Sequence, residues 1–204
     1  MHSHSDRLNE ARGNPISSYH LDVRLNAALE WVPNRTQRLL DIGCGEGYFL
    51  QKLLSQRKSI QAFGVDISQT NLNFAKKHIP DAKFLLAPAE KLPFKTAFFD
   101  CITCLEVLDH LPKPEKPIRE IYRVLKPDGT FILSIPSYDN PLWPPIWKLW
   151  TWTLGRKWRH AHIQGFNQTS IQPLLRKMGF TDIKKQTAFF GLIIVISCQR
   201  KKTE

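Results

Sequence analysis

The segment RLLDIGCGEGYFL, residues 38–50, constrains the fold more strongly than any other part of the 204-residue chain. A short apolar run leads directly into glycines at positions 43, 45 and 47, and apolar side chains then recur at helical spacing. Glycine suits a backbone that turns sharply or lies against another group, because it has no Cβ. The segment is therefore typical of a buried strand that passes through a tight turn into a helix, beside a ligand.

Strand-like and helix-like apolar patterns alternate along the rest of the chain. We expect helices over residues 17–31, 48–56, 69–79, 116–126 and 169–180, and strands over residues 38–43, 61–68, 82–88, 98–107, 130–137, 181–189 and 191–202. The turn signal Pro127-Asp128-Gly129 is expected to end the helix before it. The alternation favours a parallel sheet with helices on both faces, and a short turn near Phe190 restricts the last two strands to antiparallel pairing. We therefore predict an α/β fold with a Rossmann-like, doubly wound sheet, mostly parallel and seven-stranded, whose last strand is antiparallel.

The length of the chain fits one domain over residues 1–204. Within it we expect a flexible N-terminus over residues 1–16 and a tryptophan-rich lid insert over residues 137–167. The N-terminus has no hydrophobic signal region, and no apolar run reaches the roughly 18–20 residues that a spanning helix needs. We therefore expect a cytoplasmic protein, in which the insert gives peripheral contact with a membrane.

Two of the four cysteines, Cys101 and Cys104, form a CxxC pair that invites a metal or redox interpretation. The pair lies in a segment predicted to be a buried strand, where positions three apart face opposite sides of the sheet. No second Cys/His pair stands at zinc spacing. We therefore interpret these cysteines as small buried apolar residues in a reducing compartment.

The glycine-rich segment is expected at the carboxyl edge of the sheet, where parallel sheets bind their ligands. It lacks Gly-Lys-Ser/Thr, which excludes a P-loop, and its GxGxG spacing follows an acid, Asp41. A second acid, Asp66, ends the next predicted strand, where a carboxylate can accept both ribose hydroxyls of an adenosine. Ser68 can cap the following helix, so a carboxylate at position 66 is not required for capping. The two acids favour a nucleoside ligand.

Five ordered segments resemble class I S-adenosylmethionine-dependent methyltransferases over roughly residues 39–200. They read LLDIGCGEGYFL, GVDIS, APAEKLPF, FDCITCLEVLDHLPKPEKPIREIYRVLKPDGTFILSIPS and GFTDI. The resemblance implies S-adenosyl-L-methionine as the methyl donor. It places Asp66 on the ribose and, near the methionine part of the cofactor, Asp41 and the backbone of Gly43, Cys44 and Gly45.

The third segment departs from the family pattern, which usually reads Gly-Asp-Ala-Glu before LPF. This chain has Ala-Pro-Ala-Glu, and Pro88 offers neither a side-chain acceptor nor an N–H. Adenine recognition is then expected to rest on the backbone near Ala89, on Glu90, or on packing by Ile67. We expect the cofactor to bind less tightly than in a relative that has the aspartate.

The resemblance also implies two further cofactor contacts. By its position after the fourth predicted strand, Leu105 is expected to contact the adenosine. Arg24, on the first predicted helix, matches a family arginine that pairs with the cofactor carboxylate. A solvated arginine on that helix is the alternative.

The segment CLEVLDHL, residues 104–111, follows the fourth predicted strand and should overhang the transferred methyl group. Methyl transfer needs mainly proximity and alignment, with a base if the acceptor is a hydroxyl, and His110 is the candidate base. The segment is similar to that of ubiquinone-biosynthesis O-methyltransferases, whose Glu-x-x-Glu-His triplet holds a divalent metal. The matching residues would be Glu106, Asp109 and His110. We predict no metal and favour structural hydrogen bonding, with the base and metal-ligand roles left open.

Substrate choice in this family depends on the insert after the fifth strand. Trp143, Trp147 and Trp150 are spaced i, i+4, i+7 and fall on one face of a helix, with basic residues nearby. Such a pattern suits a membrane–water interface or a large apolar substrate, with a lid packed on the core and RNA stacking as alternatives. His160 and His162 follow and could approach the substrate, although a structural role for each is favoured.

The chain carries a net charge of +11, which favours anionic partners or reflects solubility alone. Our leading prediction is methyl transfer to a small, apolar or lipid-like acceptor, at oxygen. One alternative is a tRNA or rRNA methyltransferase that modifies uridine, because the motifs of adenine and cytosine modification are absent. Nucleic acid is the less favoured partner. Another alternative is a non-catalytic binding protein with a degenerate methyltransferase fold.

Overall fold

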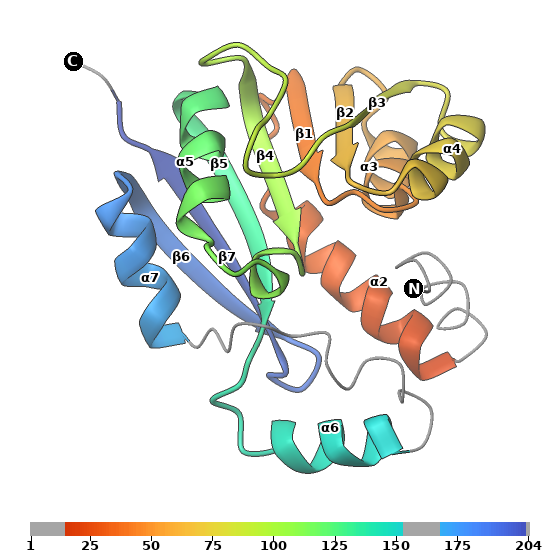
Figure 1. Cartoon of the computed structure of the whole chain (residues 1–204), viewed down its shortest axis with the longest axis vertical. Coiled ribbons are helices and arrows are strands. Elements are labelled where there is room, and N and C mark those ends of the chain that lie inside the picture. Colours follow the sequence, from red (N-terminus) through yellow and green to blue (C-terminus); the bar gives the residue numbers. More distant parts are fainter. Residues whose placement is uncertain (1–14, 153–167, 203–204) are drawn as a thin grey trace.

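A seven-stranded sheet forms the centre of the computed structural model, which describes residues 15–152 and 168–202 (Figure 1). The strand order is β3-β2-β1-β4-β5-β7-β6, and all neighbouring pairs are parallel except those that involve β7. The strands are β1 (Arg38–Ile42), β2 (Gln61–Asp66), β3 (Ala82–Leu86), β4 (Phe99–Leu105), β5 (Leu125–Pro136), β6 (Phe180–Ala188) and β7 (Ile193–Arg200). The predicted fold, including the antiparallel last strand, is confirmed.

Helices cover both faces of the sheet. The helices of the described residues are α2 (Pro15–Glu30), α3 (Tyr48–Gln56), α4 (Gln69–His78), η1 (Leu108–His110), α5 (Glu115–Val124), α6 (Trp143–Trp152) and α7 (Gln168–Lys177), of which α6 lies beyond the end of the sheet (Figure 1). One buried cluster joins α5 and α7 to the sheet, and a second joins α2, α3 and α4 to its other face (Figure 1). Strands covered on both faces are apolar throughout, which explains the continuous runs in the sequence.

The two cysteines of the CxxC pair lie in β4 and point to opposite faces of the sheet. Cys104 belongs to the cluster under α5, and Cys101 to the cluster under α2. Both thiols are fully buried, and burial raises the pKa of each. The interpretation as small buried apolar residues is confirmed.

The boundary between α5 and β5 differs from the expected one. The helix ends at Val124 and the strand begins at Leu125, so the signal Pro127-Asp128-Gly129 lies inside β5. Leu125 pairs with Phe99 of β4, and the register then shifts before Cys101 pairs with Thr130. The extra residues of β5 form an irregularity in which Asp128 has φ +60°. Strand pairing thus overrides the local turn signal.

The first helix packs against the later strands rather than standing apart. Leu25, Ala28 and Leu29 are buried, on the face that the sequence pattern indicates. At its end, Trp31 Nε1 donates to Gln186 Oε1 of β6 at 2.9 Å. This attachment places the inner face of α2 beside the glycine-rich turn.

Parts of the predicted organisation fall outside the described residues. They include almost all of the N-terminal stretch over residues 1–16, and residues 153–167 of the insert. None of the helices within the described ranges has the length and apolar character to cross a membrane.

Candidate functional site

The glycine-rich turn follows β1 at the carboxyl edge of the sheet, where the strand order reverses between β1 and β4. The N–H of Gly43 donates to the Val65 carbonyl at 2.8 Å, which ties the turn to the end of β2. Gly43 has φ +67°, and a Cβ there would lie 2.3 Å from Val107 Cγ2. Gly47 has φ +83° at the start of α3, where a Cβ would lie 2.5 Å from Ile79 Cδ1. Both positions therefore require glycine.

Asp66 is held by the backbone on both sides of its carboxylate. Oδ2 accepts from the N–H of Gly45 at 2.8 Å, and Oδ1 accepts from the N–H of Ser68 at 2.8 Å. Ser68 itself caps α4, because its Oγ accepts from the N–H of Asn71. The half-buried carboxylate is thus fixed in orientation and keeps lone pairs for two further donors.

Asp41 is almost completely buried at the opposite side of the turn. Its Oδ1 accepts from Thr103 Oγ1 at 2.7 Å. Burial raises its pKa to about 7, and the nearby Asp66 adds to the rise, while the Thr103 bond and Arg24 oppose it. A buried acid of this kind is stabilised in its charged form by a cation bound beside it.

Arg24 projects from α2 toward Asp41 and is partly buried. Its Nε is buried and has no hydrogen-bond partner within the described ranges. His20, one helical turn earlier, has its pKa lowered to about 4 by burial and by the Arg24 charge. One nitrogen of the guanidinium is thus removed from water, and an anion bound beside it would satisfy that nitrogen.

Two exposed apolar side chains flank Asp66 at the far end of the turn. Ile67 is 78% exposed and Leu86, which pairs with Asp66 in the sheet, is 56% exposed. Ala89 is buried and Glu90 half-buried in the loop that follows β3. Such a pair of apolar groups suits the faces of a flat ring. The sequence analysis did not identify Leu86, because nothing in the apolar run before Ala87 shows which leucine lies at the end of the strand.

The end of β4 brings together the residues predicted for chemistry. Leu105 is half-buried. Glu106 has a positive φ of +56°, and its Oε1 accepts a hydrogen bond from Ser134 Oγ at 3.0 Å. Asp109 is fully buried in η1, and its Oδ2 lies 3.7 Å from Nε2 of the partly exposed His110. Across the described part of the chain, no group of three His, Cys, Asp or Glu side chains is arranged to hold a metal ion.

Tyr138, which the sequence analysis did not single out, connects this region to the insert. Burial and the nearby charges of Asp109 and Glu106 raise the pKa of its phenol. Its ring packs edge to face on Trp143, with the centroids 5.3 Å apart. No motif in the sequence marks Tyr138, so its place between the end of β4 and Trp143 could not be predicted.

The insert contains the predicted helix, α6, over residues 143–152. Trp143 is half-buried against Tyr138. Trp147 and Trp150 belong to α6, but their side chains lie outside what the structure describes, and His160 and His162 lie outside the described residues altogether. The predicted substrate contacts of these residues stay predictions.

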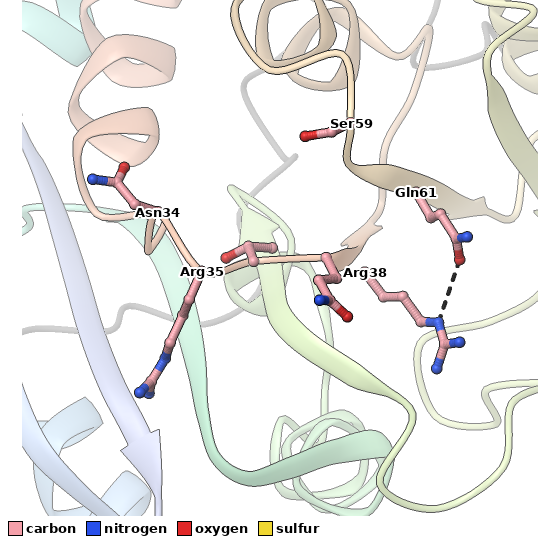
Figure 2. Close-up of a pocket in the computed structure, with 7 residues that line it drawn as sticks. Asn34, Arg35, Arg38, Ser59 and Gln61 are labelled. Atoms are coloured by element: carbon pink, nitrogen blue, oxygen red, sulfur yellow. Dashed lines mark hydrogen bonds between the residues drawn. The ribbon is translucent and has the colours of Figure 1, made fainter.

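A separate hollow lies at the opposite, amino-terminal edge of β1 and β2 (Figure 2). It is lined by polar side chains such as Asn34, Arg35 and Ser59. Arg38 Nε donates to Gln61 Oε1 at 3.3 Å on its wall. The site at the carboxyl edge does not include this hollow.

Comparison with known proteins adds to this geometry. A family model described as "Methyltransferase domain" matches residues 40–133. The chain is similar to the ubiquinone/menaquinone biosynthesis C-methyltransferase of Rickettsia prowazekii, with 36% identity covering 83% of this chain and 78% of that protein. It is also similar to the ubiquinone biosynthesis O-methyltransferase of Pseudomonas fluorescens, with 32% identity covering 59% of this chain and 50% of that protein. The chain thus matches about half the length of that O-methyltransferase.

Among solved structures, the fold is shared with a Haloferax volcanii protein in complex with the Trm112 methyltransferase activator. The TM-score is 0.79 at 18% identity, and the match covers 98% of this chain and 97% of the other.

Proposed function

Because the chain belongs to the class I S-adenosylmethionine-dependent methyltransferases, we propose that it methylates a small, apolar or lipid-like acceptor at an oxygen atom. The observation that carries the choice of acceptor is the exposed apolar surface of α6, the next helix after β5, beyond the carboxyl end of that strand (Figure 1). The similarity to two ubiquinone-biosynthesis enzymes supports the same class of acceptor. Family membership argues against a fold that is used for binding alone.

The cofactor, S-adenosyl-L-methionine, supplies an activated methyl group on a sulfonium. The residues at the carboxyl edge fit its parts in order. Asp66 would accept from the ribose hydroxyls, and the exposed Ile67 and Leu86 would pack on the two faces of the adenine. Glu90 and the backbone at Ala89 would face the adenine edge. This arrangement leaves the adenine without the aspartate that relatives supply, because Pro88 occupies its position.

The methionine end of the cofactor would lie over the glycine-rich turn. The backbone of Gly43, Cys44 and Gly45 would approach it, and of these residues only Cys44, whose thiol is buried, carries a side chain. Arg24 would pair with the carboxylate, and Asp41 would accept from the ammonium. Leu105 would contact the adenosine from the end of β4. Both charged groups of the methionine part would thus have a partner of opposite charge.

We propose that His110 is the base that removes the proton from the acceptor hydroxyl. The imidazole is partly exposed, and its Nε2 lies 3.7 Å from the buried carboxylate of Asp109. An imidazole can accept a proton from a hydroxyl, so His110 would act as the base while the oxygen is methylated. Trp143 would line the path to the acceptor, together with Trp147, His160 and His162 of the insert.

The test is incorporation of label from methyl-labelled S-adenosylmethionine into a lipid extract or into total RNA. We expect label in the lipid fraction, and label in RNA alone would overturn the proposal in favour of a nucleic-acid methyltransferase. Treatment of the labelled product with hydriodic acid distinguishes methylation at oxygen from methylation at carbon. The acid releases an O-methyl group as methyl iodide and leaves a C-methyl group in place. An Asp66→Ala variant provides the control for labelling that does not depend on the site.

We further propose that α6 brings the enzyme to a membrane that holds the acceptor. The ten residues of α6, at about 1.5 Å rise each, are too short to span a bilayer, so the helix would lie in the interface. Lys148 is exposed on it, next to apolar side chains, as suits contact with anionic headgroups.

A further inference from the structure

Thr103 is a polar residue in the middle of a buried apolar strand. Its neighbours in β4, Ile102 and Cys104, are fully buried, and Thr103 is buried to the same degree. Strands that are covered on both faces are usually apolar, because a buried hydroxyl without a hydrogen bond costs free energy. The hydroxyl at this position therefore needs a partner inside the protein.

The partner of Thr103 is the carboxylate of Asp41 on the adjacent strand. The two residues are paired directly in the parallel register of β1 and β4. Thr103 Oγ1 lies 2.7 Å from Asp41 Oδ1 and 3.4 Å from the carbonyl oxygen of Leu40. A hydroxyl has one proton to donate, and both the shorter distance and the charge of the acceptor direct that proton to Asp41.

This bond engages one oxygen of the carboxylate and leaves the other available. Within the described ranges of the chain, Thr103 is the one side chain that donates a hydrogen bond to Asp41, so Oδ2 keeps its lone pairs for a donor from outside. The β-branched side chain of Thr103 has few rotamers, which fixes the carboxylate in one orientation. Oδ2 is thus oriented before any ligand binds.

The charge of Asp41 depends on the same bond. Burial raises the pKa of Asp41 to about 7, and of the two effects that lower this pKa the Thr103 bond is larger than the charge of Arg24. The nearby Asp66 of β2 raises it further. His20 adds no charge near pH 7, because burial and the Arg24 charge lower the pKa of its imidazole to about 4.

Two thiols also lie close to Asp41 and stay neutral. Burial raises the pKa of both Cys44 and Cys104 well above the ordinary value of a thiol. Neither thiol therefore competes with Asp41 for a cation near neutral pH. Thr103 is the neutral donor that favours the charged form of the acid without adding a charge to the site.

We propose that Thr103 is a positioning residue for the amino group of the cofactor, because its hydroxyl stabilises the Asp41 carboxylate and leaves one carboxylate oxygen free for the ammonium. Thr103 is fully buried and acts through Asp41. This role rests on the proposed contact between Asp41 and the ammonium of S-adenosylmethionine. It adds that a hydroxyl in the core of the sheet sets the strength of that contact.

The experiment is isothermal titration with S-adenosylhomocysteine and with 5′-methylthioadenosine, which have the same adenosine, although only the first carries the amino-acid part. Thr103→Val removes the hydroxyl with little change in shape. At a pH of about 6.5 it should weaken the binding of S-adenosylhomocysteine about tenfold, because the ionised Asp41 loses a donor. This affinity should still rise with pH above about 7, where that of the unmodified protein levels. The affinity for 5′-methylthioadenosine should not change.

Two further variants separate the hydroxyl from the shape of the side chain. Thr103→Ser keeps a hydroxyl and should restore most of the affinity and the pH profile of the unmodified protein. Thr103→Ala lacks the hydroxyl, as Thr103→Val does, and should show the same change in pH profile. An equal loss of affinity for both ligands in these variants would overturn the proposal, because it would show a general disturbance of the site.

Asp41→Asn distinguishes the role of Thr103 from the proposed contact on which it rests. Unchanged binding of S-adenosylhomocysteine by Asp41→Asn would remove the contact, and the role of Thr103 with it. If Asp41→Asn weakens binding and abolishes the pH dependence while Thr103→Val changes neither, the contact stands and the role assigned to Thr103 is wrong.

Discussion

The most direct prediction concerns Asp66, whose carboxylate joins the glycine-rich turn to the end of β2. In Asp66→Asn, the amide can still accept from one backbone N–H but presents its own NH₂ to the other, so one of the two 2.8 Å bonds is lost. Loss of one charge-assisted bond to the Gly45 N–H or the Ser68 N–H costs about 1.5–3 kcal/mol. The ribose would lose a charged acceptor as well, with a similar cost. Together the two losses come to about 3–6 kcal/mol, so we expect S-adenosylmethionine to bind about 10²- to 10⁴-fold more weakly.

Isothermal titration with S-adenosylmethionine and with S-adenosylhomocysteine measures this loss. Both ligands carry the same ribose, so both affinities should fall by the same factor. Asp81→Asn, in the exposed turn before β3, is the matched control and should leave both affinities unchanged. Normal affinity of the Asp66 variant, in a protein that unfolds at the usual urea concentration, would show that the carboxylate does not bind the ribose.

Four further substitutions test other parts of the site. Gly43→Ala should lower the free energy of unfolding by about 2–4 kcal/mol, because its Cβ would meet Val107 at a positive φ; an unchanged urea midpoint would contradict the packing. Pro88→Asp should tighten cofactor binding about tenfold by restoring an acceptor for the adenine amine, and calorimetry that shows equal affinity would refute this role. Because Asp41 must ionise to bind an ammonium and its pKa is about 7, cofactor affinity should rise with pH up to about 7 and then level, and Asp41→Asn should abolish this dependence. Because the pKa of Asp41 is higher in the folded protein than in the unfolded chain, the folded protein without cofactor binds more protons between pH of about 4 and 7. Its free energy of unfolding should therefore fall as the pH rises through this range. Once a hydroxyl acceptor is identified by labelling, His110→Gln should lower kcat about 10²-fold with cofactor affinity unchanged, whereas a structural histidine would alter both or neither.

The fold could be predicted because the periods of the apolar residues differ so clearly between strands and helices. Leu39, Leu40 and Ile42 form an apolar run broken only by the buried Asp41, since β1 is covered on both faces, while α2 shows the spacing of a helix with one buried side. The boundary at Leu125 could not be predicted in this way. Its pairing with Phe99 is a tertiary contact, and the local signal of Pro127-Asp128-Gly129 points elsewhere.

The carboxyl-edge site was predictable where backbone geometry demands a particular residue. Gly43 and Gly47 are such positions, and the sequence shows them directly. Leu86 and Tyr138 were missed because their importance comes from where the chain ends a strand or crosses the edge of the sheet, and common residues of these types occur throughout the sequence. The roles of the site residues toward cofactor and acceptor stay predictions.

The orientation of α6 shows why a helix can be found in a sequence when its outward face cannot. Almost every residue from Leu142 to Trp152 is apolar or aromatic, so the pattern has no polar side to mark the solvent. The spacing of the tryptophans drew attention to one face, but Trp143 packs on Tyr138. The exposed large apolar side chains described in this region are instead Leu142, Ile146, Leu149 and Trp152. Two contacts orient the helix. Trp143 packs on Tyr138, and Asn140 donates from Nδ2 to the Phe190 carbonyl of the β6–β7 turn at 3.1 Å while its Oδ1 accepts from the N–H of Leu142 at 2.9 Å. Burial and the nearby charges of Asp109 and Glu106 raise the pKa of the Tyr138 phenol, so the contact with Tyr138 attaches the start of α6 beside the end of β4.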